Sequence, residues 1–120
     1  MIAMIFEYWF DPDSPQIFNE YLEASDEVRA ALIDIDGFHS VERFESSTDP
    51  GKYVAIGFFD DETAVSAWRN HSQHRHAQAI GRHRFFTDYR IRMARVIRDY
   101  GPAHRDQAPV DSRAAHDIEV

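Results

Sequence analysis

The sequence predicts an α+β domain built around a four-stranded antiparallel sheet. Four stretches have the β-branched, aromatic or alternating composition of strands, and two have the apolar spacing of amphipathic helices. Along the chain they follow the order β-α-β-β-α-β, which is that of the ferredoxin-like fold. With 120 residues, of which 43% are hydrophobic, the chain has room for one such domain with a substantial core.

The first strand and the first helix are predicted within residues 2–33. Residues 2–10 are rich in β-branched and aromatic side chains and interrupted only by Glu7, which indicates a buried strand. After a turn, Ser14 is the expected N-cap and Pro15 the first helical residue. The helix then repeats apolar side chains at helical spacing: Phe18, Leu22, Val28, Ala31 and Leu32.

A β-hairpin is predicted over residues 38–59. Residues 38–46 alternate, which places Phe38, Ser40, Glu42 and Phe44 on one face of a strand. Residues 47–52 are rich in turn formers, and the apolar residues 53–59 form the next, central strand. Gly57 within it indicates a bulge or a close approach by another group.

The second helix and the closing strand follow. Acidic residues at 60–62 favour a helix start, with Asp60 or Asp61 as the cap. The helical pattern breaks near Asn70 and resumes as far as Phe86. Residues 89–100 then alternate as a long strand, with Ile91, Met93, Arg95 and Ile97 on one face.

The composition changes after Gly101 and Pro102, because residues 103–120 contain no aromatic side chain. We expect a domain over residues 1–101 and a disordered or loosely attached tail over residues 102–120.

Charge and composition exclude several classes of protein. The net charge of −8 argues against a nucleic acid partner. The absence of cysteine excludes a disulfide framework and thiolate metal sites. No apolar run approaches the ~20 residues that span a bilayer, and the N-terminus lacks the basic start of a signal peptide. We therefore expect a cytoplasmic protein with no membrane partner.

The predicted fold has an assembly consequence. Two helices cover one face of a four-stranded sheet, yet the first and third strands are apolar on both faces. An apolar face of this size is typical of an interface. We expect a homodimer whose bare faces meet and curl into a dimeric α/β barrel around a pocket.

Three segments carry a family resemblance: the hairpin stretch SVERFESSTDPGKYVAIGFFDDETAVSAW, the helical run 68–74 and the closing strand DYRIRMARVIRDYG. With the first strand and helix, residues 2–101 resemble the antibiotic biosynthesis monooxygenase family, a group of dimeric α/β barrels. Some members oxygenate polycyclic phenols to quinones without metal or flavin, with the deprotonated substrate itself reducing dioxygen. The resemblance therefore implies a monooxygenase acting on a small aromatic or phenolic substrate, with no cofactor.

The candidate catalytic residues are Trp68, His71 and His74. Because they follow one another at intervals of three, consecutive members share a helical face. An imidazole is a suitable base near neutral pH, or an iron ligand. The alternative is that Trp68 is a core residue and that the histidines rim the break in the helix.

The candidate substrate-binding residues are Arg43, Arg92, Tyr8 and Tyr53. An arginine on a strand can hold a phenolate or a carboxylate, and a tyrosine can donate to a substrate oxygen. The alternatives are cross-strand ion pairs for the arginines and packing for the tyrosines. No metal site is expected, because His74 and His76 point to different helical faces.

Two alternative functions stay open. Another branch of the family binds and degrades haem, using a histidine on the second helix, a tryptophan and an asparagine on the first strand. Here the first strand has Glu7 and Tyr8 in that region and no asparagine, which disfavours haem degradation but leaves haem binding. The other alternative is a non-catalytic dimer that binds a small molecule.

Overall fold

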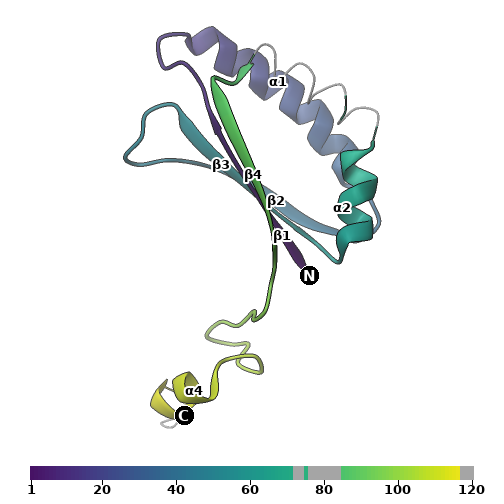
Figure 1. The fold of residues 1–120 in the computed structure, drawn as a ribbon, viewed down its shortest axis with the longest axis vertical. Helices are drawn as coiled ribbons and strands as arrows, with labels where there is room; N and C mark the ends of the chain where they lie inside the picture. Colours follow the sequence, from purple (N-terminus) through teal and green to yellow (C-terminus); the bar gives the residue numbers. More distant parts are fainter. Residues whose placement is uncertain (72–74, 76–84, 117–120) are drawn as a thin grey trace.

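The computed structural model describes residues 1–71, 75 and 85–116. Its elements are β1 (Ile2–Trp9), α1 (Pro15–Leu32), β2 (Phe38–Glu45), β3 (Lys52–Phe59), α2 (Glu62–Arg69), β4 (Asp88–Arg95) and α4 (Val110–His116). The four strands form one antiparallel sheet in the order β2-β3-β1-β4. Both α1 and α2 lie over the same face of this sheet (Figure 1). The predicted α+β ferredoxin-like fold is confirmed.

Local signals fix the starts of the two helices. Ser14 occupies the N-cap position of α1 as predicted, but its side chain makes no capping hydrogen bond. In α2 the Asp61 carboxylate accepts the backbone N–H of Ala64 at 2.9 Å, so Asp61 is the cap. The helix ends at Arg69 with Asn70 as its C-cap, where the sequence pattern predicts a break.

The core consists of two clusters, one at each end of the helix-covered face. The cluster beside α2 contains Ile2, Leu32, Phe59, Ala64, Val65 and Trp68. The other cluster contains Tyr8, Phe10 and Phe85, with partly buried aromatic rings of α1 and β3 around them. Because Ile2 and Tyr8 stand at opposite ends of β1, the middle of the helix-covered face lies between the two clusters.

The predicted alternation of β2 is wrong at its start. The register against β3 shifts between Phe38 and Ser40, so the strand carries an irregularity at His39. The Phe38 ring packs against Phe59, with ring centres 5.8 Å apart. Phe38 therefore faces the helices and does not share a face with Ser40. An extra residue in one strand has this effect, because it changes the side to which the following side chains point.

The closing strand is shorter than predicted. β4 ends at Arg95, although residues 96–100 continue the same alternation. Its neighbour β1 begins at Ile2, and the last bond between the two segments runs from the Val96 N–H to the Met1 carbonyl at 3.0 Å. Beyond that point the chain has no strand to pair with, so the length of β1 limits the length of β4.

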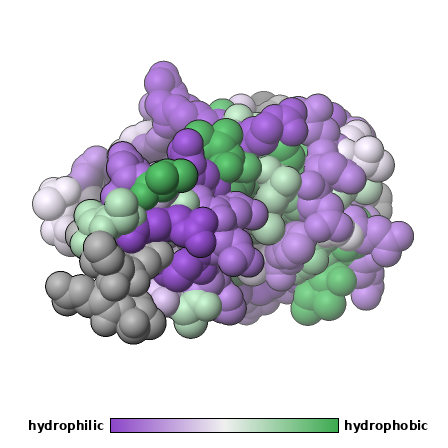
Figure 2. Space-filling model, turned by 90° about the horizontal axis from the view of Figure 1, so that it is seen from below, coloured by the Kyte–Doolittle hydropathy of each residue, from purple (hydrophilic) through white to green (hydrophobic). Residues whose placement is uncertain are grey.

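Residues 96–116 form an arm that extends away from the sheet and carries α4 at its far end (Figure 1). Ile97 and Val110 on this arm are 78% and 82% exposed. In the view from below, apolar side chains appear as separate green patches among hydrophilic ones (Figure 2). Among the helices that the structure describes, none is long and apolar enough to cross a membrane.

Candidate active site

A cavity of about 180 Å³ lies between the sheet and α1. For comparison, a cavity of roughly 150 Å³ in a protein core holds one benzene molecule. Its walls are mostly apolar, and the aliphatic and phenylalanine side chains come from all four strands and α1. They include Met4, Phe6, Val28, Val41, Ala55 and Ile91. The space is therefore suited to a ligand with one ring and a short substituent.

Tyr8 lies on β1 at one end of this cavity. Its side chain is fully buried, and its hydroxyl has no hydrogen-bond partner among the described residues. Burial raises the pKa of Tyr8, and the nearby Tyr21 raises it further, against a smaller opposite effect of Arg43. The hydroxyl therefore stays protonated and keeps a donor available to a ligand.

Arg43 enters the same end of the cavity from the edge strand β2. Its guanidinium carbon lies 5.8 Å from the centre of the Tyr21 ring, and its Nη1 lies 3.4 Å from the Ser25 hydroxyl. No carboxylate in the described part of the chain forms an ion pair with Arg43. The predicted alternative of cross-strand pairing for Arg43 is thus not what the structure shows.

Sequence reasoning missed Tyr21 and Ser25. They lie four residues apart on α1, and the same line continues through Val28 and Leu32, all of which line the cavity. The apolar spacing that predicts the helix does not include a tyrosine or a serine. Their position identifies them instead, because residues three or four apart on the helix face the sheet whatever their side chains.

Trp68 lies at the other end of the cavity. It is 5% exposed, belongs to the core cluster beside α2 and also lines the cavity, so it is both a core residue and a site residue. The His71 ring centre lies 6.3 Å from that of Trp68, and the His71 N–H donates to the Trp68 carbonyl at 3.1 Å. His74 lies outside the described residues.

Tyr53 is close to the cavity without lining it. Its ring stacks on Phe18 at 4.8 Å between ring centres and on Tyr8 at 6.0 Å. Desolvation raises the pKa of Tyr53, and Glu45 raises it further. The Tyr53 ring therefore packs against the Tyr8 ring from outside the cavity.

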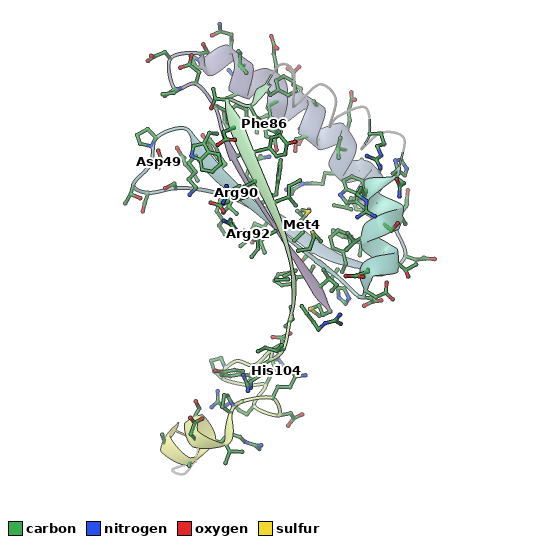
Figure 3. All side chains as sticks on the ribbon, viewed as in Figure 1. Met4, Asp49, Phe86, Arg90, Arg92 and His104 are labelled. Carbon is green, nitrogen blue, oxygen red and sulfur yellow. The ribbon has the colours of Figure 1, made fainter. Side chains whose placement is uncertain are left out.

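Arg92 lies on the opposite face of the sheet from the cavity. It forms an ion pair with Glu7, whose other oxygen lies 2.9 Å from the Lys52 Nζ. Arg90 and Arg92 point away from the helices, whereas Met4 and Phe86 lie on the helix side (Figure 3). The structure thus brings together Trp68, Tyr8 and Arg43 but separates them from Arg92.

Comparison with known proteins gives the family. The family model described as antibiotic biosynthesis monooxygenase matches residues 1–80. This chain belongs to the antibiotic biosynthesis monooxygenase family. The predicted resemblance is therefore confirmed over two of the three helices and three of the four strands described above.

Two curated relatives match the chain. It is 34% identical over 96 residues to a protein named jasmonate monooxygenase ABM from Pyricularia oryzae. The matched segment covers 80% of this chain and 43% of that protein. It is 28% identical over 78 residues to the uncharacterised protein YqjZ of Bacillus subtilis, covering 65% and 67% of the two chains. The chain thus spans less than half of the length of the first relative.

Solved structures share the fold. A solved structure from Deinococcus radiodurans has a TM-score of 0.73 at 14% identity, covering 84% of this chain and 97% of that one. SnoaB, described as a cofactor-independent oxygenase from Streptomyces nogalater, has a TM-score of 0.67 at 12% identity, covering 82% and 94%. At these identities the likeness concerns the fold alone.

No cluster of metal-ligating side chains lies within residues 1–71, 75 and 85–116. There, no three side chains of histidine, aspartate or glutamate are grouped so as to hold a metal ion. The polar groups that line the cavity are mainly hydroxyls and the guanidinium groups of Arg29 and Arg43, all of which can donate to an oxygen anion.

Proposed function

We propose that the chain is an oxygenase that takes a small aromatic or phenolic substrate into the cavity between the sheet and α1 without a bound cofactor. The cavity itself carries the proposal. It is about 180 Å³ in volume, mostly apolar, and has a buried donor hydroxyl at one end and Trp68 at the other. It occurs in a family with a structural neighbour, SnoaB, that is described as a cofactor-independent oxygenase.

The proposed reaction needs no outside reductant. A phenol that becomes a quinone gains one oxygen atom on a ring carbon and loses two hydrogens, which is a four-electron oxidation. Dioxygen accepts these four electrons, and its second oxygen atom leaves as water together with the two hydrogens. The protein's share is to exclude water, remove a proton from the substrate and stabilise the resulting anion.

We assign roles to five residues. His71 and His74 are the proposed bases, because an imidazole accepts a proton near neutral pH. Trp68 forms the cavity wall beside His71. Arg43 and Tyr8 are the proposed partners of the substrate oxygen, since both supply donors to the cavity.

The test is oxygen uptake by the purified protein in the presence of a panel of phenols and quinols. Replacing both His71 and His74 by alanine should reduce the uptake rate by roughly 100-fold or more. His104→Ala is the matched control, because His104 is exposed on the arm (Figure 3). Unchanged uptake in the double variant would remove the chemical core of the proposal.

Jasmonate is a second candidate substrate, because the relative from Pyricularia oryzae bears the name jasmonate monooxygenase. Incubation of the protein with jasmonate, dioxygen and a two-electron donor such as ascorbate, followed by mass spectrometry, should then reveal a product with one additional oxygen atom, the second oxygen atom leaving as water. An unchanged jasmonate spectrum in a preparation that oxidises phenols would restrict the function to the phenolic class.

Haem binding and plain ligand binding are separated by two further measurements. A saturable Soret band on addition of haem, lost in His71→Ala, would replace the cofactor-free proposal by haem binding. Tight binding of ring compounds with no oxygen uptake would instead make the protein a binding protein.

We further propose a homodimer that covers the helix-free face of the sheet. This face carries a group of apolar side chains, namely Ile5, Trp9, Phe44, Val54, Ile56 and Phe58. Ile5 and Ile56 pair directly at its centre. Ile56→Asp should convert dimers to monomers in light-scattering measurements, whereas Ile33→Asp, at an exposed position after α1, should not. A monomeric native protein would contradict the proposal.

A further inference from the structure

Four donor side chains gather at one end of the cavity and come from three different elements. Tyr8 lies on β1, Arg43 on β2, and Tyr21 and Ser25 on α1. The ring centres of Tyr8 and Tyr21 are 5.4 Å apart. The Arg43 guanidinium carbon lies 5.8 Å from the centre of the Tyr21 ring, and its Nη1 lies 3.4 Å from the Ser25 hydroxyl oxygen. We call this group the anion corner.

The described lining residues include no acidic side chain. They provide hydroxyl groups and two guanidinium groups, the partly buried Arg43 and the exposed Arg29, but no aspartate or glutamate. A cation in largely apolar surroundings is costly unless it is paired, and a buried hydroxyl is costly unless it is hydrogen-bonded. Arg43 has no carboxylate partner in the described chain. The Tyr8 hydroxyl forms no hydrogen bond of regular geometry there, although Tyr21 and Arg43 lie close enough to influence its pKa. The missing partner is an acceptor that carries negative charge.

We propose that the anion corner binds the anionic oxygen of a ligand that has a single apolar ring, as a carboxylate or a phenolate. This inference rests on the proposed function, because it names the substrate class of the same cavity. Arg43 supplies the charge and Tyr8 the buried hydroxyl donor. A guanidinium is well suited to this task, since its N–H groups match the two oxygens of a carboxylate and also hold a single phenolate oxygen.

The position of the anion corner also orients the ligand. Tyr8 and Met4 both face the cavity and lie four residues apart on β1, which corresponds to about 13 Å. Met4 packs against the cluster that contains Trp68. A ligand whose anionic oxygen is held by Tyr8 and Arg43 therefore extends its apolar end towards Trp68. For a phenolate, the ring carbon opposite the oxygen is the one presented to Trp68.

Binding of phenylacetate, 4-nitrophenolate and the uncharged phenylacetamide tests the inference. Calorimetry should give the native protein at least a tenfold preference for each anion over the amide. Arg43→Gln should weaken the binding of both anions by roughly 10- to 100-fold, as expected when a charged hydrogen bond is lost, and leave the affinity for the amide unchanged. Arg90→Gln is the matched control, because Arg90 is a strand arginine on the opposite face of the sheet.

Two further readouts separate binding chemistry from loss of fold. Arg43→Lys keeps the charge without the planar fork and should bind the anions with intermediate affinity. Bound 4-nitrophenol should show the absorption of its ionised form at a pH below that at which the free phenol ionises. Stronger binding of phenylacetate identifies the ligand head group as a carboxylate, and stronger binding of 4-nitrophenolate identifies it as a phenolate.

Equal binding of anions and amide, unchanged anion affinity in a folded Arg43→Gln, or no binding of either anion would overturn the inference. Oxygen uptake on the same samples separates it from the proposed function. Anion binding through Arg43 without uptake of oxygen for any phenol would refute the oxygenase and keep the anion corner. Undiminished uptake in Arg43→Gln would refute the anion corner and keep the oxygenase.

Discussion

Arg43 on β2 lies over the ring of Tyr21 on α1 at one end of the cavity, with the guanidinium carbon 5.8 Å from the centre of the tyrosine ring. A cation beside an aromatic ring is attracted by it, so the contact links the edge strand to the helix. It also holds the positive charge at the cavity in an acidic protein with a net charge of −8.

Tyr8→Phe should stabilise the free protein. The variant removes a fully buried hydroxyl that has no partner in the described chain and keeps the ring packing. We expect the free energy of unfolding to rise by about 1 kcal/mol, measured by denaturant unfolding without ligand. Tyr100→Phe on the exposed arm should change nothing. A loss of stability in Tyr8→Phe would mean that the hydroxyl is satisfied in the free protein.

Asp61→Ala should loosen α2 and with it the Trp68 wall of the cavity. The Asp61 carboxylate accepts the Ala64 N–H at the start of the helix. We expect a loss of about 1 kcal/mol in the free energy of unfolding. Asp61→Asn retains a good cap and should stay close to the native value. Equal losses in both variants would show that charge, and not capping geometry, is what matters there.

Glu7 should make stability depend on pH on the acidic side. A hydrogen bond from Lys52 lowers the pKa of Glu7 below its ordinary value of 4.5, and Arg92 acts in the same direction. A lowered pKa in the folded state stabilises the protein above pH 4.5, and this contribution is lost as the pH falls through the folded-state pKa. Glu7→Gln should therefore unfold at a lower temperature than the native protein at pH 7, and the two melting temperatures should converge towards pH 2. A constant difference across that range would contradict this account.

The domain boundary proposed at Gly101 predicts that removing the rest of the arm leaves the fold intact. Residues 102–116 lie away from the sheet, with Val110 82% exposed (Figure 1). A protein of residues 1–101 should unfold at the same temperature as the full chain and retain its affinity for ring compounds. A marked drop in unfolding temperature would show that the arm belongs to the domain or joins two copies of it.

Several elements were predictable because their signals are local. Pro15 marks the first turn of α1, acidic residues mark the start of α2, and a cluster of turn formers separates β2 from β3. These features depend on neighbours in sequence, so the pattern alone is enough to find them.

Other features depend on partners far away in the chain. The bulge that turns Phe38 towards the helices exists only in the pairing of β2 with β3. The end of β4 at Arg95 is set by the start of β1. The position of Arg92 on the face away from the cavity likewise follows from the β1–β4 register, which pairs it with Ile5.

The most direct test of the oxygenase is incubation of the protein with a phenol that it consumes, under ¹⁸O₂ in ordinary water. The account predicts a quinone that carries one ¹⁸O atom, with oxygen uptake and quinone in equal amounts and no added cofactor. A quinone without ¹⁸O, or no product from any phenol that binds in the cavity, would contradict it.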